Sequence, residues 1–218
     1  MQYNLSHLTQ NADQNVLGPL QDDEALLLFA VCRVVCARRV AEFGGLDGYS
    51  AKNFLAALKN VPGARLYTID PKLEGTLADN HVHVRKWAKD VAATDFDGER
   101  LDLVLFDCHD YEQQLQALET LTRTGIITSE TILALHDTGT HPGKIVPWAY
   151  EAKDGYIHQT AERQLVNTLQ DLGYECVSFH APKPTPPILF RHGLTLCRLR
   201  QRFDNERVAG YLGSATRI

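Results

Sequence analysis

Apolar segments typical of strands alternate with amphipathic segments typical of helices along most of this 218-residue chain. Because the strand segments are almost continuously apolar, we expect them to pair in a parallel sheet that helices cover on both faces. The last two strands have no helix between them, which favours antiparallel pairing there. The pattern therefore predicts an α/β fold, doubly wound, with a mainly parallel seven-stranded sheet and an antiparallel last strand. The expected strands are 39–43, 65–70, 82–87, 101–107, 131–137, 174–179 and 194–199, and the expected helices are 23–37, 50–59, 111–124 and 159–172.

Length and composition indicate one globular domain. We place it at residues 21–203, between a polar arm at 1–20 and a tail at 204–218, and a chain of this length can bury a core without disulfides. The net charge of -5 and the lack of a basic stripe argue against a nucleic-acid partner. The longest unbroken apolar run, 25–32, is too short to span a membrane. The polar start shows no signal peptide and the five cysteines form no CxxC pair, so we expect a cytoplasmic protein with reduced thiols.

A glycine-rich segment follows the first expected strand, at the edge of the sheet where open α/β folds bind ligands. It reads Glu42-Phe43-Gly44-Gly45-Leu46-Asp47-Gly48-Tyr49-Ser50. The dinucleotide pattern G-x-G-x-x-G does not fit, because Leu46 stands where the middle glycine belongs. What remains is E-x-G-x-x-x-G, in which the acid would repel a pyrophosphate and suits a cationic ligand. A plain tight turn is the alternative interpretation.

This segment resembles the first motif of the class I S-adenosylmethionine-dependent methyltransferases, and later segments resemble further motifs of that family over about residues 20–200. The resemblance implies a Rossmann-like methyltransferase fold and S-adenosylmethionine as the cofactor. Asp70 would hold the ribose hydroxyls, and Glu42 would lie near the amino end of the cofactor or behind the loop. Trp87 and Ala88 fall where the family holds the adenine, although a Trp there is as often core packing. The implied cofactor residues are Glu42, Gly44, Gly45, Gly48, Ser50, Asp70, Trp87, Ala88 and Asp107.

Two further strand ends carry residues suited to chemistry on an acceptor. They read Asp107-Cys108-His109-Asp110 and His136-Asp137-Thr138. These stretches resemble a subgroup of small-molecule O-methyltransferases with the patterns D-G-D-H-x-Y-E and H-D-T, although the first stretch is one residue shorter here. The resemblance implies a small-molecule acceptor with a hydroxyl group. In metal-dependent members, acids at these strand ends bind Mg²⁺ or another divalent metal, and Thr138 replaces an Asn of that metal set.

A hydroxyl becomes a good nucleophile when a base removes its proton or a cation holds its oxygen. A neutral histidine is the natural base near pH 7, so we predict catalytic roles for His109 and Asp107. We also predict a divalent ion on Asp107 and Asp137. His136 would be its third ligand only if the strand has begun to turn, because adjacent side chains of a strand point to opposite faces. The alternatives are structural: the acids would cap turns or helices, Asp110 would cap helix 111–124, and His136 would bond backbone in the core.

The irregular segment 138–158 follows one of these strand ends, so we interpret it as an acceptor-binding loop or lid, with a packed surface loop as the alternative. Sugar, polyketide and phenolic acceptors all remain open. Two rival functions are an NAD-dependent oxidoreductase on a similar sheet and a non-catalytic cofactor-binding partner protein. The apolar helix 23–37 could also form the interface of a homo-oligomer.

Overall fold

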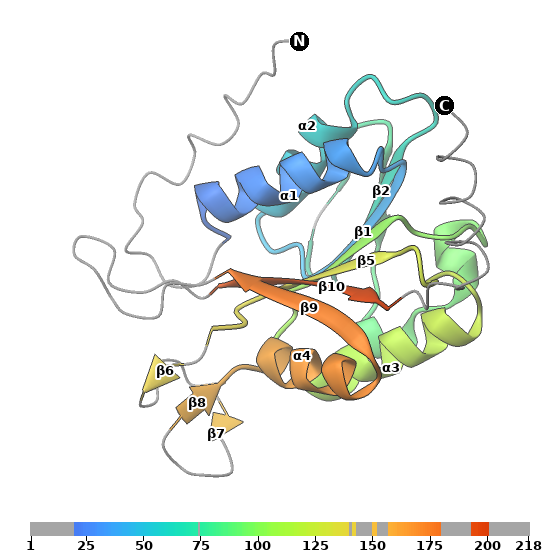
Figure 1. The fold of residues 1–218 in the computed structure, drawn as a ribbon. Helices are drawn as coiled ribbons and strands as arrows, with labels where there is room; N and C mark the ends of the chain where they lie inside the picture. Colours follow the sequence, from blue (N-terminus) through green and yellow to red (C-terminus); the bar gives the residue numbers. More distant parts are fainter. Residues whose placement is uncertain are drawn as a thin grey trace, which may run out of the picture.

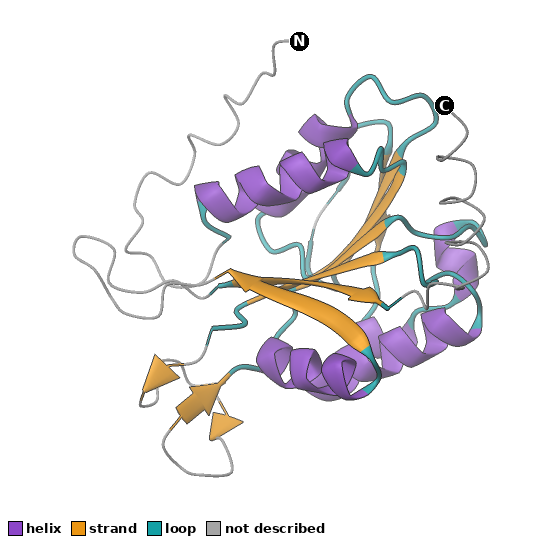
Figure 2. Ribbon diagram, in the orientation of Figure 1, coloured by secondary structure: helices purple, strands orange, loops and turns teal. Residues whose placement is uncertain are grey.

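One central sheet lies between two layers of helices (Figures 1 and 2). The computed structural model describes residues 20–73, 75–139, 141–142, 150–151, 157–179 and 193–200. The strand order across the sheet is β3-β2-β1-β4-β5-β10-β9. These strands are β1 (Arg39–Phe43), β2 (Arg65–Ile69), β3 (His81–Val84), β4 (Leu103–Phe106), β5 (Ile132–His136), β9 (Tyr174–Phe179) and β10 (Leu194–Leu199).

The pairing of the strands confirms the predicted fold class. β1 pairs in parallel with β2 and β4, β2 pairs in parallel with β3, and β4 with β5. Among the described strands of this sheet, β10 runs antiparallel to both of its neighbours, β5 and β9. The strand order reverses between β1 and β4, and in open α/β sheets such a switch point places a crevice at the carboxyl ends of the strands.

Helices cover both faces because the strands are apolar on both. α1 (Asp22–Val34) and α2 (Tyr49–Leu58) pack on one face, and α3 (Tyr111–Arg123) and α4 (Ala161–Asp171) pack on the other (Figure 1). Strand β4 shows the alternation: Leu103 and Leu105 belong to the core under α1 and α2, while Val104 and Phe106 belong to the core under α3 and α4. None of the described helices is long and apolar enough to cross a membrane.

Side-chain caps fix where two of the helices begin. The Asp110 carboxylate accepts a hydrogen bond from the backbone N–H of Gln113 at 3.0 Å, and the Thr160 hydroxyl accepts one from the N–H of Arg163. Both bonds satisfy donors that the first turn of a helix leaves without a partner inside the helix. The capping role that was the alternative for Asp110 is therefore confirmed. The caps start α3 and α4 directly beside the carboxyl ends of β4 and β5.

The strand predicted at 82–87 is three residues too long at its carboxyl end. β3 stops at Val84, whose carbonyl accepts a hydrogen bond from the N–H of Lys86 and so turns the chain out of the sheet. Two short 3-10 helices follow, η2 (Ala88–Asp90) and η3 (Ala93–Phe96). Trp87 is 50% exposed where the chain leaves the sheet, so the sequence pattern had continued the strand through an apolar residue that does not belong to it.

The segment that was expected to be irregular, 138–158, forms most of a small antiparallel sheet. Its strands are β6 (His141–Pro142), β7 (Tyr150–Glu151) and β8 (Ile157–Gln159), in the order β6-β8-β7. Such short strands are held by backbone pairing and leave little hydrophobic pattern in a sequence. Within the predicted acceptor loop, residues 140, 143–149 and 152–156 lie outside the described residues, as do the proline-rich segment 182–187, the arm at 1–19 and the tail at 204–218.

Candidate active site

A cavity of about 810 Å³ opens at the carboxyl ends of the parallel strands, within the size range of small-molecule sites. The glycine loop, the ends of β2 and β4, and the turn after β3 line it. Glu42 and Gly48 are not among its lining residues, since Glu42 is fully buried and Gly48 is the N-cap of α2. The predicted cofactor residues that do line the cavity are Gly44, Gly45, Ser50, Asp70, Trp87, Ala88 and Asp107.

Two glycines let the loop after β1 lie against its neighbours. A Cβ at Gly44 would fall 2.3 Å from the backbone oxygen of Asp107, and the φ of Gly44 is +99°. A Cβ at Gly45 would fall 2.5 Å from Cγ2 of Thr68. Only glycine fits at such distances and such a φ. The loop therefore packs directly on the ends of β4 and β2, where the acids of the site begin.

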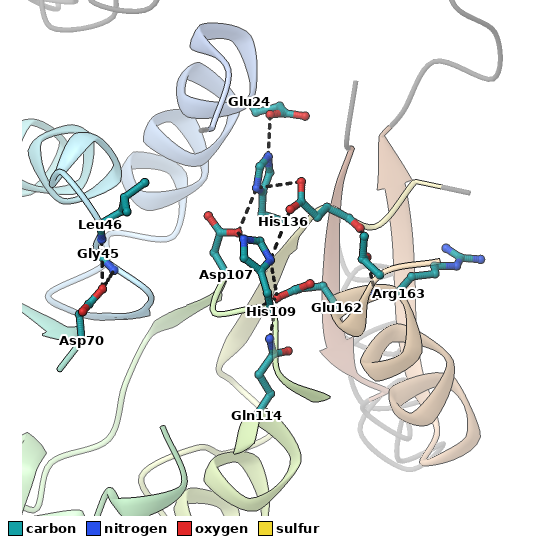
Figure 3. Close-up of polar contacts among 12 residues, drawn as sticks. Glu24, Gly45, Leu46, Asp70, Asp107, His109, Gln114, His136, Glu162 and Arg163 are labelled. Atoms are coloured by element: carbon teal, nitrogen blue, oxygen red, sulfur yellow. Dashed lines mark hydrogen bonds and ion pairs between the residues drawn. The ribbon is translucent and has the colours of Figure 1, made fainter. Parts of the chain in front are cut away.

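The carboxylate of Asp70 ties the glycine loop to the end of β2 (Figure 3). Its Oδ2 accepts hydrogen bonds from the N–H groups of Gly45 (2.9 Å) and Leu46 (3.1 Å). Its Oδ1 accepts from the N–H groups of Lys72 (2.7 Å) and Leu73 (3.2 Å). Burial alone would raise the pKa of Asp70, but these four donors together lower it. Asp70 therefore shapes the loop, and any contact with ribose hydroxyls would come in addition to these bonds.

Glu42 lies inside the protein at the base of the glycine loop. Its Oε1 accepts a hydrogen bond from the Thr68 hydroxyl at 2.6 Å, and the same hydroxyl oxygen lies 2.8 Å from Nε2 of His81. Nδ1 of His81 accepts from the N–H of Leu77, so a neutral ring carries its proton on Nε2. Burial raises the pKa of Glu42 to about 7, and the nearby carboxylates of the site act in the same direction. This acid supports the loop from within and does not reach the cavity.

The second half of the site is a cluster of Asp107, His109 and Asp137, which could hold a metal ion. One donor atom from each lies within 4.8 Å of the others. Nδ1 of His109 is 3.5 Å from Oδ2 of Asp137, and its Nε2 is 3.9 Å from Oδ1 of Asp107. His109 and Asp137 both have left-handed backbones, with φ of 57° and 55°. Non-glycine residues rarely adopt this conformation, and here it turns both strand ends so that their side chains converge.

His136 lies between this cluster and Glu24 (Figure 3). It is buried, with Nδ1 3.1 Å from Oδ1 of Asp107 and 3.3 Å from Oδ1 of Asp137. Its Nε2 is 3.1 Å from Oε2 of Glu24. Burial alone would lower the pKa of His136, but the surrounding carboxylates raise it well above its ordinary value. The histidine that shares the donor cluster with the two strand-end acids is thus His109, and His136 bonds to the acids from the protein interior.

Two buried acids of the site were not predicted from the sequence. Glu24 comes from the first turn of α1, and Glu162 from the first turn of α4. Glu162 Oε1 accepts hydrogen bonds from the backbone N–H of His109 (2.7 Å) and from Nε2 of Gln114 (2.6 Å). The sequence did contain a signal for them. Each acid stands four or seven residues before apolar residues, and so on the same face of its helix: Glu24 with Leu28, and Glu162 with Val166 and Leu169. An acid on the apolar face of a helix indicates a buried partner.

The carboxylates around His109 change its protonation. Burial lowers the pKa of this histidine, but Glu162, Asp107 and Asp137 outweigh that effect and raise the pKa to about 9. The Asp107 carboxyl itself has a raised pKa, chiefly because it is buried, and Asp137 adds to the effect. Without a ligand, His109 is therefore an imidazolium at neutral pH, and a base role requires that something remove this proton first.

The chemistry of the donor set suits a divalent cation. Carboxylate oxygens are the ligands that Mg²⁺ prefers, and an added imidazole nitrogen suits Mn²⁺ or a similar metal. Four carboxylates surround two histidines, so negative charge exceeds positive charge even when both rings are protonated and the acids are ionised. The four acids are Glu24, Asp107, Asp137 and Glu162. Thr138, which by the resemblance stands in the place of an Asn of the metal-dependent subgroup, is buried.

Comparison with known proteins agrees with this geometry. Residues 41–138 match the family model described as a methyltransferase domain. No curated protein sequence matches the chain significantly. The matched residues run from β1 through the end of β5, so they include the glycine loop, Asp70 and the cluster of Asp107, His109 and Asp137.

Solved structures with the same fold include three proteins with bound cofactor. The chain is similar to an O-methyltransferase from Bacillus cereus in complex with SAH, with a TM-score of 0.60, 14% identity, and 90% of each chain covered. It is similar to the O-methyltransferase TomG from Streptomyces achromogenes in complex with SAM, with a TM-score of 0.57 and 20% identity, and the match covers 90% of this chain and 89% of that one. It is also similar to cofactor-bound Rv0187 from MTB, with a TM-score of 0.61 and 18% identity, and that match covers 91% of this chain and 88% of the other. At these identities the likeness establishes the fold. The chain therefore has the fold of these methyltransferases, and its residues 41–138 match a methyltransferase domain.

Proposed function

We propose that this methyltransferase transfers the methyl group of S-adenosylmethionine to a hydroxyl of a small molecule, with the help of a divalent cation. The observation that carries the proposal is the position of Asp107 and His109. Both residues line the cavity in which we place the cofactor, and both belong to the cluster with Asp137. A methyl donor in the cavity and an acceptor oxygen at the cluster would therefore meet at these two side chains.

The cofactor would lie along the glycine loop. Gly44 and Gly45 allow close approach of the backbone, and Asp70 would meet the ribose from the end of β2. Trp87 is half exposed and lines the cavity beside Ala88, which suits stacking against an adenine. Two of the O-methyltransferases with this fold hold SAH or SAM, which supports the same cofactor here.

Asp107 and Asp137 would hold the cation, with His109 as the third donor of the cluster. A bound divalent cation supplies a positive charge that orients an acceptor oxygen and lowers the pKa of its hydroxyl. The left-handed turns at His109 and Asp137 aim these donors at a shared point. His136, which the sequence had suggested as a ligand, would instead hold Asp107 from behind through Nδ1.

His109 has two distinct roles open to it, ligand or base. As a base it would take the hydroxyl proton on a ring nitrogen, and Glu162 beneath it would stabilise the resulting imidazolium. As a ligand it would use a nitrogen for the cation, and its loss would weaken metal binding. His109→Ala separates the two: a base loses turnover at unchanged metal affinity, whereas a ligand loses both.

The direct test is methyl transfer from labelled S-adenosylmethionine to a panel of sugar, polyketide and phenolic hydroxyls. The protein is first stripped with EDTA, then assayed alone and after addition of Mg²⁺ or Mn²⁺. The proposal expects transfer that depends on the added ion and that Asp137→Asn abolishes. Full activity in the stripped protein would overturn the role of the cation. Tight binding of NAD with no binding of S-adenosylmethionine would favour the oxidoreductase alternative instead.

A further inference from the structure

Glu24 precedes the matched residues 41–138 in the sequence, but its side chain contacts His136 beside the cluster of Asp107, His109 and Asp137. It belongs to the first turn of α1 and is only 7% exposed. Residues 41–138 contain the cofactor loop and the cluster, so this helix lies outside the part of the chain that the family model matches. A buried carboxylate is costly unless charged or hydrogen-bonding groups surround it, so its position requires an explanation.

The explanation is a chain of two short contacts through His136 (Figure 3). Oε2 of Glu24 lies 3.1 Å from Nε2 of His136, and Nδ1 of the same ring lies 3.1 Å from Oδ1 of Asp107. A carboxylate can only accept hydrogen bonds, so the ring donates from both nitrogens when it joins two ionised acids. The ring plane is therefore fixed from both ends. Asp107, which lines the cavity and belongs to the cluster, is fixed in turn.

Glu24 is itself held in place by the start of α1. Oε2 of Glu24 also accepts the backbone N–H of Gln21 at 3.0 Å, which caps the helix. Further along α1, the carbonyl of Ala25 accepts from Nδ2 of Asn53 on α2, the helix that follows the glycine loop. Glu24 is thus fixed within the first turn of α1, and the neighbouring residue ties that turn to α2, which gives His136 a rigid partner.

We propose that Glu24 is a positioning residue for the cation site: it fixes the His136 ring, and the ring orients the carboxylate of Asp107. The inference rests on the proposed function, because it assumes that Asp107 binds the cation. Groups that hold metal ligands from behind commonly change metal affinity by about 10- to 100-fold when they are mutated. A residue that merely stabilised α1 would change the melting temperature without changing metal affinity.

The experiment is calorimetric titration of the full chain with Mn²⁺ as the probe, after EDTA treatment, for the wild type and Glu24→Gln. Glu24→Gln keeps the shape of the side chain and removes its charge. Asp23→Asn is the matched control, because Asp23 is the neighbouring acid of the same helical turn and is exposed. Binding of SAH and thermal melting are recorded for every variant, since both report on the fold independently of the metal.

A second comparison asks whether Glu24 acts through His136. His136→Asn keeps a nitrogen donor in the place of Nδ1, toward Asp107, and removes the nitrogen that faces Glu24. If Glu24 acts on Asp107 only through the His136 ring, Glu24→Gln has little further effect on Mn²⁺ affinity in the His136→Asn background. The double variant replaces the buried Glu24 carboxylate and the His136 ring with two neutral amides, so neither of these two groups is left as a buried charge facing a lost partner. It therefore replaces Glu24→Gln in the comparison with the wild type if that single variant does not fold.

The expected result is Mn²⁺ affinity about 10- to 100-fold weaker in Glu24→Gln, unchanged in Asp23→Asn, with SAH affinity the same in both. Equal Mn²⁺ affinity in the wild type and Glu24→Gln would overturn the positioning role and leave the cation site standing. An equal loss in the wild-type and His136→Asn backgrounds would overturn the route through His136. No Mn²⁺ binding by the wild type would overturn the cation site and, with it, this inference.

Discussion

Glu42 should make the stability of this protein fall as the pH rises. The ordinary pKa of its carboxyl is 4.5, and burial raises the pKa to about 7 in the folded protein. The folded state therefore holds a proton that the unfolded chain has already released between these two values, and stability is lost from pH 4.5 up to about pH 7. Since each tenfold change in an ionisation constant is worth about 1.4 kcal/mol, the loss amounts to about 3 kcal/mol. Glu42 is fully buried, so solvent does not screen this effect.

Glu42→Gln removes the titration and keeps an oxygen that can accept the hydrogen bond of the Thr68 hydroxyl. The assay is urea unfolding of the wild type and Glu42→Gln at several values of pH between 5 and 8. Other groups titrate in both proteins, so the difference between the two free energies of unfolding isolates Glu42. We expect the free energy of unfolding of Glu42→Gln to rise relative to that of the wild type by up to about 3 kcal/mol from the low to the high end of this pH range. If the two free energies of unfolding changed with pH in parallel, the buried, protonated state of Glu42 would be refuted.

Three further predictions concern the cavity and the cluster. Gly44→Ala should abolish SAH binding by calorimetry, because a Cβ there would lie 2.3 Å from a backbone oxygen; wild-type affinity would show that the loop does not pack as described. Asp70→Ala should weaken SAH binding by about 1–3 kcal/mol through loss of the loop bonds and of any ribose contact, and unchanged binding would remove Asp70 from the site. His109→Ala should slow methyl transfer by about 10²- to 10⁴-fold while SAH affinity stays constant, and near-wild-type turnover would leave His109 without a catalytic role.

Local patterns predicted much of the fold. The strands at 39–43, 174–179 and 194–199 have the predicted bounds, because apolar runs there begin and end at clear polar or turn residues. The antiparallel placement of β10 also follows from a connection without a helix. The third strand was predicted too long, because hydrophobicity alone does not distinguish a strand residue from a cavity residue such as Trp87.

The site could be predicted only in the parts that lie next to strand ends. The convergence of Asp107 and Asp137 follows from neighbouring parallel strands, and their ends do meet. Which histidine shares the donor cluster, His109 or His136, depends on two left-handed backbone turns. Such turns cannot be predicted from the sequence where the residues are not glycine. Glu24 and Glu162 reach the cluster from helices far away in the sequence, so only the packing of α1 and α4 brings them there.

The central claim is that one cavity brings a methyl donor to a cation held by Asp107 and Asp137. A crystal structure of the full chain with SAH and Mn²⁺ measures this directly, because the anomalous signal of manganese locates the ion. The account predicts SAH along the glycine loop and an anomalous peak between Asp107, His109 and Asp137, beside the sulfur of the cofactor. SAH bound elsewhere, or a manganese peak away from these three residues while SAH occupies the cavity, would contradict it.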